Sequence, residues 1–255
     1  MHYLLWFKKD LRLTDHAALV WAAEQARACG GGVLALWVDE PAAWQQPDAS
    51  RRHWGFANEC VRELAADIAA QGGQLLRCQG DMLAVLQGLH RALGTFILVS
   101  HEETGNAWSF ERDKAVAAWC RAQGVPWREF PGNGVVRRLQ SHGGGRNRWS
   151  AHWEARMQSP PLPAPQAVPW SALPVGCSAE PSPAHLGLAD DDAPQRQRGG
   201  RSQAHALLAS FLNERGQHYR SRMANPLQGA DSCSRISPHL AWGVLSVKEA
   251  LHATL

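Results

Sequence analysis

The residues best suited to chemistry lie near the end of the chain, in a short polar loop ahead of an expected helix. The loop reads CSRISP, Cys233–Pro238. Ser237 is a preferred N-cap type, and Pro238 suits the first helical position because its missing N–H would have no partner there. Hydroxyls, helix-end amides and the Arg235 charge are the donors that a phosphate needs. The loop is compatible with a phosphate site, although taken alone it favours an ordinary capped helix.

A second motif opens the chain. It reads WFKKDLRLTDHAAL, Trp6–Leu19. This stretch resembles the N-terminal motif of the DNA photolyase/cryptochrome family, Trp-Phe-Arg-x-Asp-Leu-Arg-x-x-Asp-Asn-x-Ala-Leu. Lys8 stands where the family usually has arginine, and His16 where it usually has asparagine. The matching residues are Trp6, Phe7, Asp10, Leu11, Arg12, Asp15, Ala18 and Leu19.

The C-terminal loop is in turn similar to the flavin-phosphate loop of the same family, which runs Gly-Thr-Ser-Arg-Leu-Ser-Pro. Two motifs in the family's order are more specific than either alone, and the resemblance covers nearly the whole chain. Cys233 stands at the usual threonine position, and a thiol is a weak donor, so we expect one phosphate hydrogen bond to be weakened or lost. The resemblance implies that FAD is bound by Tyr219, Cys233, Ser234, Arg235, Ile236 and Ser237.

The function implied by the resemblance is that of a photolyase-type flavoprotein, a deoxyribodipyrimidine photolyase (a carbon–carbon lyase). In such an enzyme, reduced FAD donates an electron to a pyrimidine dimer flipped out of damaged DNA, and the protein binds and orients flavin and lesion. No residue of this chain is assigned as the redox catalyst. The alternatives are a cryptochrome-like blue-light sensor, an isolated nucleotide-binding α/β module without photochemistry, and a degenerate product without function.

A polar stretch, HEETGNAW at His101–Trp108, follows the fourth expected strand. In the resembled family an antenna chromophore, a folate or a deazaflavin, lies in or near this domain. The resemblance therefore makes Glu102, Glu103 and Asn106 candidate chromophore contacts. The alternative is a polar loop that only joins a strand to a helix, and the sequence does not separate the two.

Within the opening motif, the residue types favour structural roles over ligand contact. We expect Asp10 and Arg12 to form an ion pair that braces the first strand–helix turn, and Asp15 to cap the following helix. His16 is expected at the surface, because no partner at metal-ligand spacing accompanies it in the sequence. No metal site is predicted.

Apolar runs of strand length alternate with helical patterns over the first half of the chain. This alternation predicts an α/β fold with a five-stranded parallel, doubly wound (Rossmann-like) sheet, whose ligands lie beyond the carboxyl ends of the strands. The expected strands cover Tyr3–Phe7, Gly31–Val38, Leu75–Cys78, Thr95–Ser100 and Val125–Phe130.

Three regions are expected along the chain. They are an α/β antenna domain at residues 1–131, an interdomain linker with a short helix at 132–198, and the start of a FAD-binding helical domain at 199–255. Prolines are concentrated in the linker. A capping box at Ser246–Glu249 opens a last helix shortly before Leu255. Because members of the resembled family continue for roughly as long again, we expect an incomplete all-α domain and an N-terminal fragment that is inactive alone.

The composition is that of a globular protein, with 45% apolar and 19% charged residues among 255. A net charge of +3 is compatible with an anionic partner but does not by itself indicate nucleic-acid binding. The six cysteines include no C-x-x-C pair, which favours free thiols in a reducing setting. No apolar run approaches the length of a membrane span. We therefore expect a cytoplasmic monomer without membrane contact.

Overall fold

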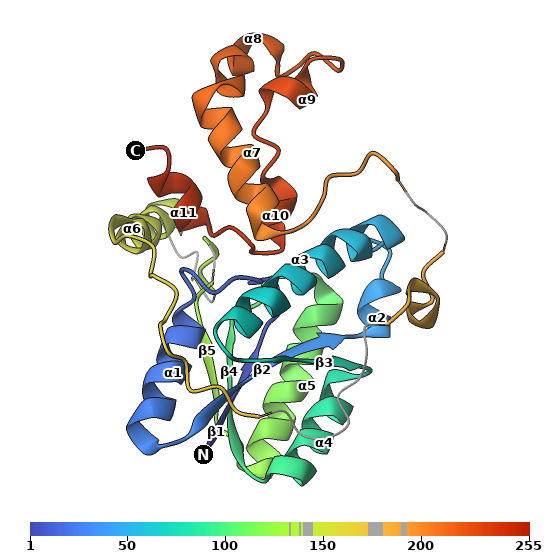
Figure 1. Cartoon of the computed structure of the whole chain (residues 1–255), viewed down its shortest axis with the longest axis vertical. Coiled ribbons are helices and arrows are strands. Elements are labelled where there is room, and N and C mark those ends of the chain that lie inside the picture. The colour runs from blue at the N-terminus through green and yellow to red at the C-terminus, as the bar shows by residue number, and fades with distance from the viewer. Residues whose placement is uncertain (133, 138, 140–144, 173–180, 190–192) are drawn as a thin grey trace.

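The computed structural model describes the chain except for residues 133, 138, 140–144, 173–180 and 190–192. Its N-terminal half is a five-stranded sheet flanked by helices (Figure 1). All neighbouring strands are parallel, in the order β3-β2-β1-β4-β5. The predicted parallel sheet is thus confirmed, close to its expected strand bounds. The strands are β1 His2–Trp6, β2 Gly32–Asp39, β3 Leu75–Gln79, β4 Phe96–His101 and β5 Trp127–Phe130.

Helices cover both faces of the sheet, as the predicted double winding requires. The three central strands, β1, β2 and β4, are mostly buried and apolar on both faces for this reason. The edge strands β3 and β5 carry charged and partly exposed residues. Strand order reverses direction between β1 and β4, which places a crevice at the carboxyl ends of these strands. One face is covered by α1 Ala17–Cys29 and α3 Arg51–Ala70, the other by α4 Met82–Leu93 and α5 Ala107–Gln123, and a short α2 Pro41–Trp44 follows β2.

The C-terminal part of the chain is mostly helical where the structure describes it. In Figure 1, α7, α8 and α9 extend away from the sheet, while α10 lies beside α3. The predicted capping box is present at the start of α11, where Ser246 Oγ accepts the Glu249 amide N–H at 3.0 Å. The elements are α6 Gly145–Gln158, η1 Pro183–Leu186, α7 Arg201–Asn213, η2 Arg215–His218, α8 Tyr219–Arg222, α9 Gly229–Ser232, α10 Ser237–Ala241 and α11 Val247–His252.

Part of the segment expected as a linker pairs with the sheet. The Val33 amide N–H donates to the Pro169 carbonyl, and the Ser171 amide N–H donates to the Val33 carbonyl, each at 2.8 Å. These residues therefore extend the hydrogen bonding of β2 at its amino end. Across the described residues, no helix combines the length and the apolar character needed to cross a membrane.

The start of α1 differs from the prediction. The cap is His16, whose Nδ1 accepts the Leu19 amide N–H at 3.0 Å. Asp15, the predicted cap, has a φ of 50° in the left-handed region, and its Oδ1 accepts the Leu162 amide N–H at 3.2 Å. The Asp15 carboxylate thus binds a residue distant in sequence, instead of capping the helix as its local position predicted.

Candidate functional site

The predicted flavin loop forms one wall of an open hollow of about 550 Å³. Ser237 is exposed at this hollow, and Tyr219 is 38% exposed. Ile236 is the exception, because its side chain packs against the hydrophobic core instead. The structure therefore brings together most of the predicted residues around one space. Those that line it are Tyr219, Cys233, Ser234, Arg235 and Ser237.

The predicted N-cap at Ser237 is wrong. Helix α10 begins at Ser237, and Ile236 occupies the N-cap position without a side-chain capping bond. Helix α10 has only five residues, so its dipole gives little support to an anion, because the macrodipole is a sum over aligned peptides. Any phosphate recognition would fall to the groups of the loop itself.

The backbone of the loop is shaped for an anion. Arg235 has a φ of 58° in the left-handed region, and Ile236 is right-handed helical. Successive residues of this kind direct their amides to one side and form a nest for negative charge. The amides of residues 234–237 donate no hydrogen bond to any described residue.

The carbonyls of the same loop are held by two side chains. Arg215 donates to the carbonyls of Cys233 and Ser234, and Gln197 Nε2 donates to the Arg235 carbonyl at 2.8 Å. With its carbonyls engaged by the protein, the loop leaves its amides available as donors. No local signal in the sequence marks Arg215 or Gln197 for this role.

A second cavity, of about 350 Å³, opens at the carboxyl ends of β1 and β2, and we name it the tryptophan cavity. Indole walls suit a flat aromatic ligand, because ring stacking and apolar burial both stabilise its binding. Its aromatic walls include Trp6, Trp37, Trp44, Trp108 and Trp242.

Two of the three candidate antenna contacts line the tryptophan cavity. They are Glu103 and Asn106, whereas Glu102 lines a neighbouring cavity of about 270 Å³. Both cavity residues already have protein partners. Asn106 caps α5 and donates to Asp48 at 3.1 Å, while Glu103 accepts from Arg112. The hydrogen bonds of Glu103 and Asn106 agree with a polar loop that only joins a strand to a helix. Their place at the cavity wall agrees with contact to an antenna chromophore.

Arg112 forms ion pairs with three carboxylates beside the tryptophan cavity. Its guanidinium contacts Glu40 at 2.8 Å and Asp113 at 2.9 Å, in addition to Glu103. Burial alone would lower the pKa of Arg112, but Glu103 and Glu40 raise it above its usual value. Burial raises the pKa of Glu40 to about 7 in spite of Arg112. The Glu40 carboxyl group is therefore protonated more readily than that of an exposed glutamate.

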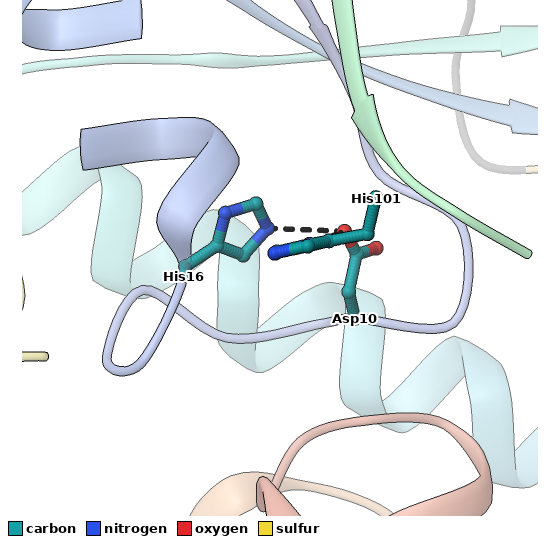
Figure 2. Close-up of side chains that lie close together, drawn as sticks. All are labelled: Asp10, His16 and His101. Carbon is teal, nitrogen blue, oxygen red and sulfur yellow. Dashed lines mark hydrogen bonds and ion pairs between the residues drawn. The ribbon is translucent and has the colours of Figure 1, made fainter. Parts of the chain in front are cut away.

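Asp10, His16 and His101 form a buried cluster where the β1–α1 loop meets the end of β4 (Figure 2). Asp10 Oδ2 accepts from His101 Nδ1 at 2.8 Å and lies 3.1 Å from His16 Nε2. Asp10 Oδ1 accepts the Lys8 amide N–H at 2.6 Å. Burial opposes ionisation of Asp10, yet the contacts with His101 and His16 hold its pKa well below its usual value.

This cluster overturns two predictions. His16, expected at the surface, is fully buried, and burial lowers its pKa to about 4. Asp10 contacts the histidines rather than Arg12, whose guanidinium donates to the carbonyls of Gly243 and Asp15 at 2.8 Å each. Partners distant in sequence replace the predicted local ion pair, because the loop turns the two side chains toward different neighbours.

The cluster contains metal-ligand residue types, but its hydrogen bonding disfavours a bound ion. Nδ1 of His16 accepts the Leu19 amide N–H, so the ring proton resides on Nε2, which faces Asp10. A metal at Nε2 would move that proton to Nδ1, directly against the Leu19 amide. We interpret the cluster as a hydrogen-bonded network that fixes the β1–α1 loop to β4.

Sequence reasoning missed several residues of these sites. His101 ends one strand and Glu40 follows another, on either side of β1. A usable signal existed for both, because the carboxyl ends of parallel strands meet at one edge of the sheet. Trp242 carries no such signal, since only the docking of a distant segment brings it to the cavity.

The comparisons with known proteins place these features in context. Residues 3–166 match the family model described as DNA photolyase. The chain is 29% identical to the deoxyribodipyrimidine photo-lyase of Agrobacterium fabrum, over 98% of this chain and 52% of the relative. It is 28% identical to cryptochrome DASH of Gloeobacter violaceus, over 96% of this chain and 51% of the relative.

A solved structure shows the same fold. The crystal structure of a cryptochrome from Synechocystis superposes with a TM-score of 0.80 at 21% identity. The match covers 98% of this chain and 54% of that chain. The chain therefore spans about half the length of these relatives.

Proposed function

Because the chain belongs to the DNA photolyase family, we propose that it carries the antenna domain and the flavin-diphosphate loop of a photolyase-type flavoprotein. When bound in the whole protein, FAD would supply light-driven single-electron chemistry for splitting pyrimidine dimers in damaged DNA. The cofactor supplies this redox chemistry. The residues of this chain bind and orient it, and the chain alone does not repair DNA.

The geometry of the flavin loop carries this proposal. Amides 234–237 are free of partners among the described residues, and Ser234, Arg235 and Ser237 line the hollow. The hydroxyls of Tyr219 and Ser237 and the charge of Arg235 add further donors. Ile236 contributes its amide alone, since its side chain belongs to the core. This donor set fits the two linked phosphates of FAD.

We further propose that the tryptophan cavity holds the antenna chromophore, a folate or a deazaflavin. Both are flat heterocycles, and the cavity offers indole walls at the carboxyl edge of the sheet. Glu103 and Asn106 line it and supply polar contacts at its wall. The free cysteines among the described residues support a reducing, cytoplasmic setting, in which we propose a monomer.

A cryptochrome-like light sensor is the second candidate. It is favoured by the similar identity of the chain to a photo-lyase and to a cryptochrome DASH, 29% and 28%. An isolated α/β module receives less support, because Trp242 from the C-terminal segment lines the same cavity as strand residues.

Binding of FAD, ADP and riboflavin to the purified chain tests the flavin loop by titration calorimetry. We expect FAD and ADP to compete for one site and riboflavin, which lacks the diphosphate, not to compete. Arg235→Gln should weaken FAD about tenfold, a loss of about 1.4 kcal/mol, whereas Arg220→Gln, an exposed arginine outside the hollow, should not. Equal competition by riboflavin, or no binding of FAD, contradicts the proposal.

A further inference from the structure

Helix α10 forms part of both candidate sites. At its start, Ser237 lines the hollow beside the flavin loop. Pro238, Ala241 and the following Trp242 line the tryptophan cavity. Because Ser237 and Pro238 are neighbours in the chain, the linings of the two sites meet on this element. A group that fixes α10 in one site must therefore act on the other.

We propose that Trp242 is a positioning residue for the flavin loop, because its packing in the tryptophan cavity holds α10 and thereby the donor-exposing shape of residues 234–237. This inference rests on the proposed FAD site. It adds that a ligand in the tryptophan cavity raises the affinity for FAD, and that bound FAD raises the affinity for that ligand.

Trp242 is held by the α/β part of the molecule. Its ring stacks on Trp44, with ring centroids 5.7 Å apart and an interplanar angle of 22°, and lies 6.4 Å from Trp37. Lys9 Nζ lies 5.9 Å from the ring centroid. The Trp242 carbonyl accepts the Leu11 amide N–H at 3.2 Å. The side chain and the backbone of Trp242 are thus both held by residues of the α/β part of the molecule.

Hydrogen bonds connect this anchor to the flavin loop. The Trp242 amide donates to the Pro238 carbonyl at 3.1 Å, and the Leu240 amide donates to the Ile236 carbonyl at 2.9 Å. Ile236 is itself part of the loop and forms the nest with Arg235. On another side of α10, His239 is fully buried against Phe56, at 5.0 Å between ring centroids. The helix therefore moves with Trp242 as one short unit.

The C-terminal segment has two states in this account, one docked on the α/β part of the molecule and one undocked from it. A chromophore in the cavity contacts Trp242 only in the docked state, and the loop keeps its shape only when α10 is fixed. Ligands that both prefer one state raise each other's affinity by the same factor. Cofactor loading would accordingly proceed cooperatively at the two sites.

The test uses three variants of the full chain, with ADP as the diphosphate probe. Trp242→Ala should weaken ADP at least tenfold, and Trp242→Phe, which keeps an aromatic ring against Trp44, should restore affinity to within about threefold of the wild type. Trp119→Ala is the matched control, because Trp119 is a partly buried tryptophan on α5 that lines neither candidate site. It should leave ADP affinity unchanged. Should the alanine variant fail to fold, Trp242→Leu takes its place, with loss of affinity again expected.

Hydrogen exchange separates failure of this inference from failure of the proposed FAD site. In the absence of ligand, the Leu240 amide should exchange faster in Trp242→Ala than in Trp119→Ala. If the wild type binds ADP and Trp242→Ala binds it equally well, or if Trp242→Phe is as weak as alanine, the positioning role is wrong and the FAD site stands. If the wild type binds no ADP, the FAD site fails, and unchanged Leu240 exchange in Trp242→Ala then overturns the positioning role independently.

Discussion

Replacing Gly243 with alanine is expected to lower the free energy of unfolding by about 3 kcal/mol. Gly243 has a φ of 62°, and a Cβ at this position would lie 2.2 Å from the Lys9 carbonyl oxygen and 2.7 Å from Asp10 Cα. Both are backbone atoms of the opening-motif loop, so neither yields without moving that loop. The Arg12 hydrogen bond to the Gly243 carbonyl, at 2.8 Å, would be disturbed at the same time.

Urea unfolding followed by tryptophan fluorescence measures this loss, since several indoles lie at the docking contact. Gly88→Ala is the matched control. Gly88 lies within α4, and a Cβ there meets nothing within 4 Å. This change should raise the unfolding free energy by about 0.5–1 kcal/mol, because alanine is the better helix former. An unfolding midpoint of Gly243→Ala equal to that of the wild type would show that the C-terminal segment does not dock in this way.

Replacing His16 with asparagine is expected to remove much of the acid sensitivity of the fold. The pKa of His16 falls from 6.5 to about 4 in the folded chain, because burial and the His101 charge disfavour its protonated form. Between pH 4 and 6.5 the unfolded chain therefore binds a proton that the folded chain does not. Stability consequently declines as pH falls through this window, by up to about 3 kcal/mol from this group.

The contribution of His16 is measured as the difference in stability between the variant and the wild type at each pH. Glu40 acts in the opposite sense, because its pKa rises from 4.5 to about 7 on folding, so its contribution declines as pH increases over that range. Both proteins share Glu40, and asparagine retains an N-cap acceptor for α1. We therefore expect the urea midpoint of His16→Asn, relative to that of the wild type, to rise as the pH falls from 7 to 4.5. His152→Asn, at an exposed position on α6, serves as control. Parallel pH profiles for His16→Asn and the wild type would contradict the buried, neutral state of His16.

The sheet was predictable because its signal is local and repeated. Each apolar run has strand length, and each is followed by a helical pattern, so a parallel doubly wound sheet was the consistent solution. The capping box at Ser246 also followed from residue type and spacing. Such features depend on neighbours in the sequence, and these neighbours stay together in the fold.

The loops were less predictable, because tertiary partners decide their contacts. The sequence predicted His16 at the surface and Asp10 in an ion pair with Arg12. Both residues are instead buried beside His101 at the end of β4. The flavin loop was found through a family motif, while the arginine that holds its carbonyls, Arg215, lies outside that motif. The tryptophan cavity draws its walls from four segments of the chain, within residues 6–9, 37–53, 103–112 and 238–242, and no single window of sequence contains it.

The absorption spectrum of the purified chain, after incubation with FAD and size-exclusion chromatography, tests the central claim most directly. We expect a flavin band that elutes with the protein and is weaker in Arg235→Gln at equal protein concentration. A folded, colourless protein, with all FAD eluting at the position of the free cofactor, would contradict the assignment of residues 234–237 as a flavin-diphosphate loop in this chain.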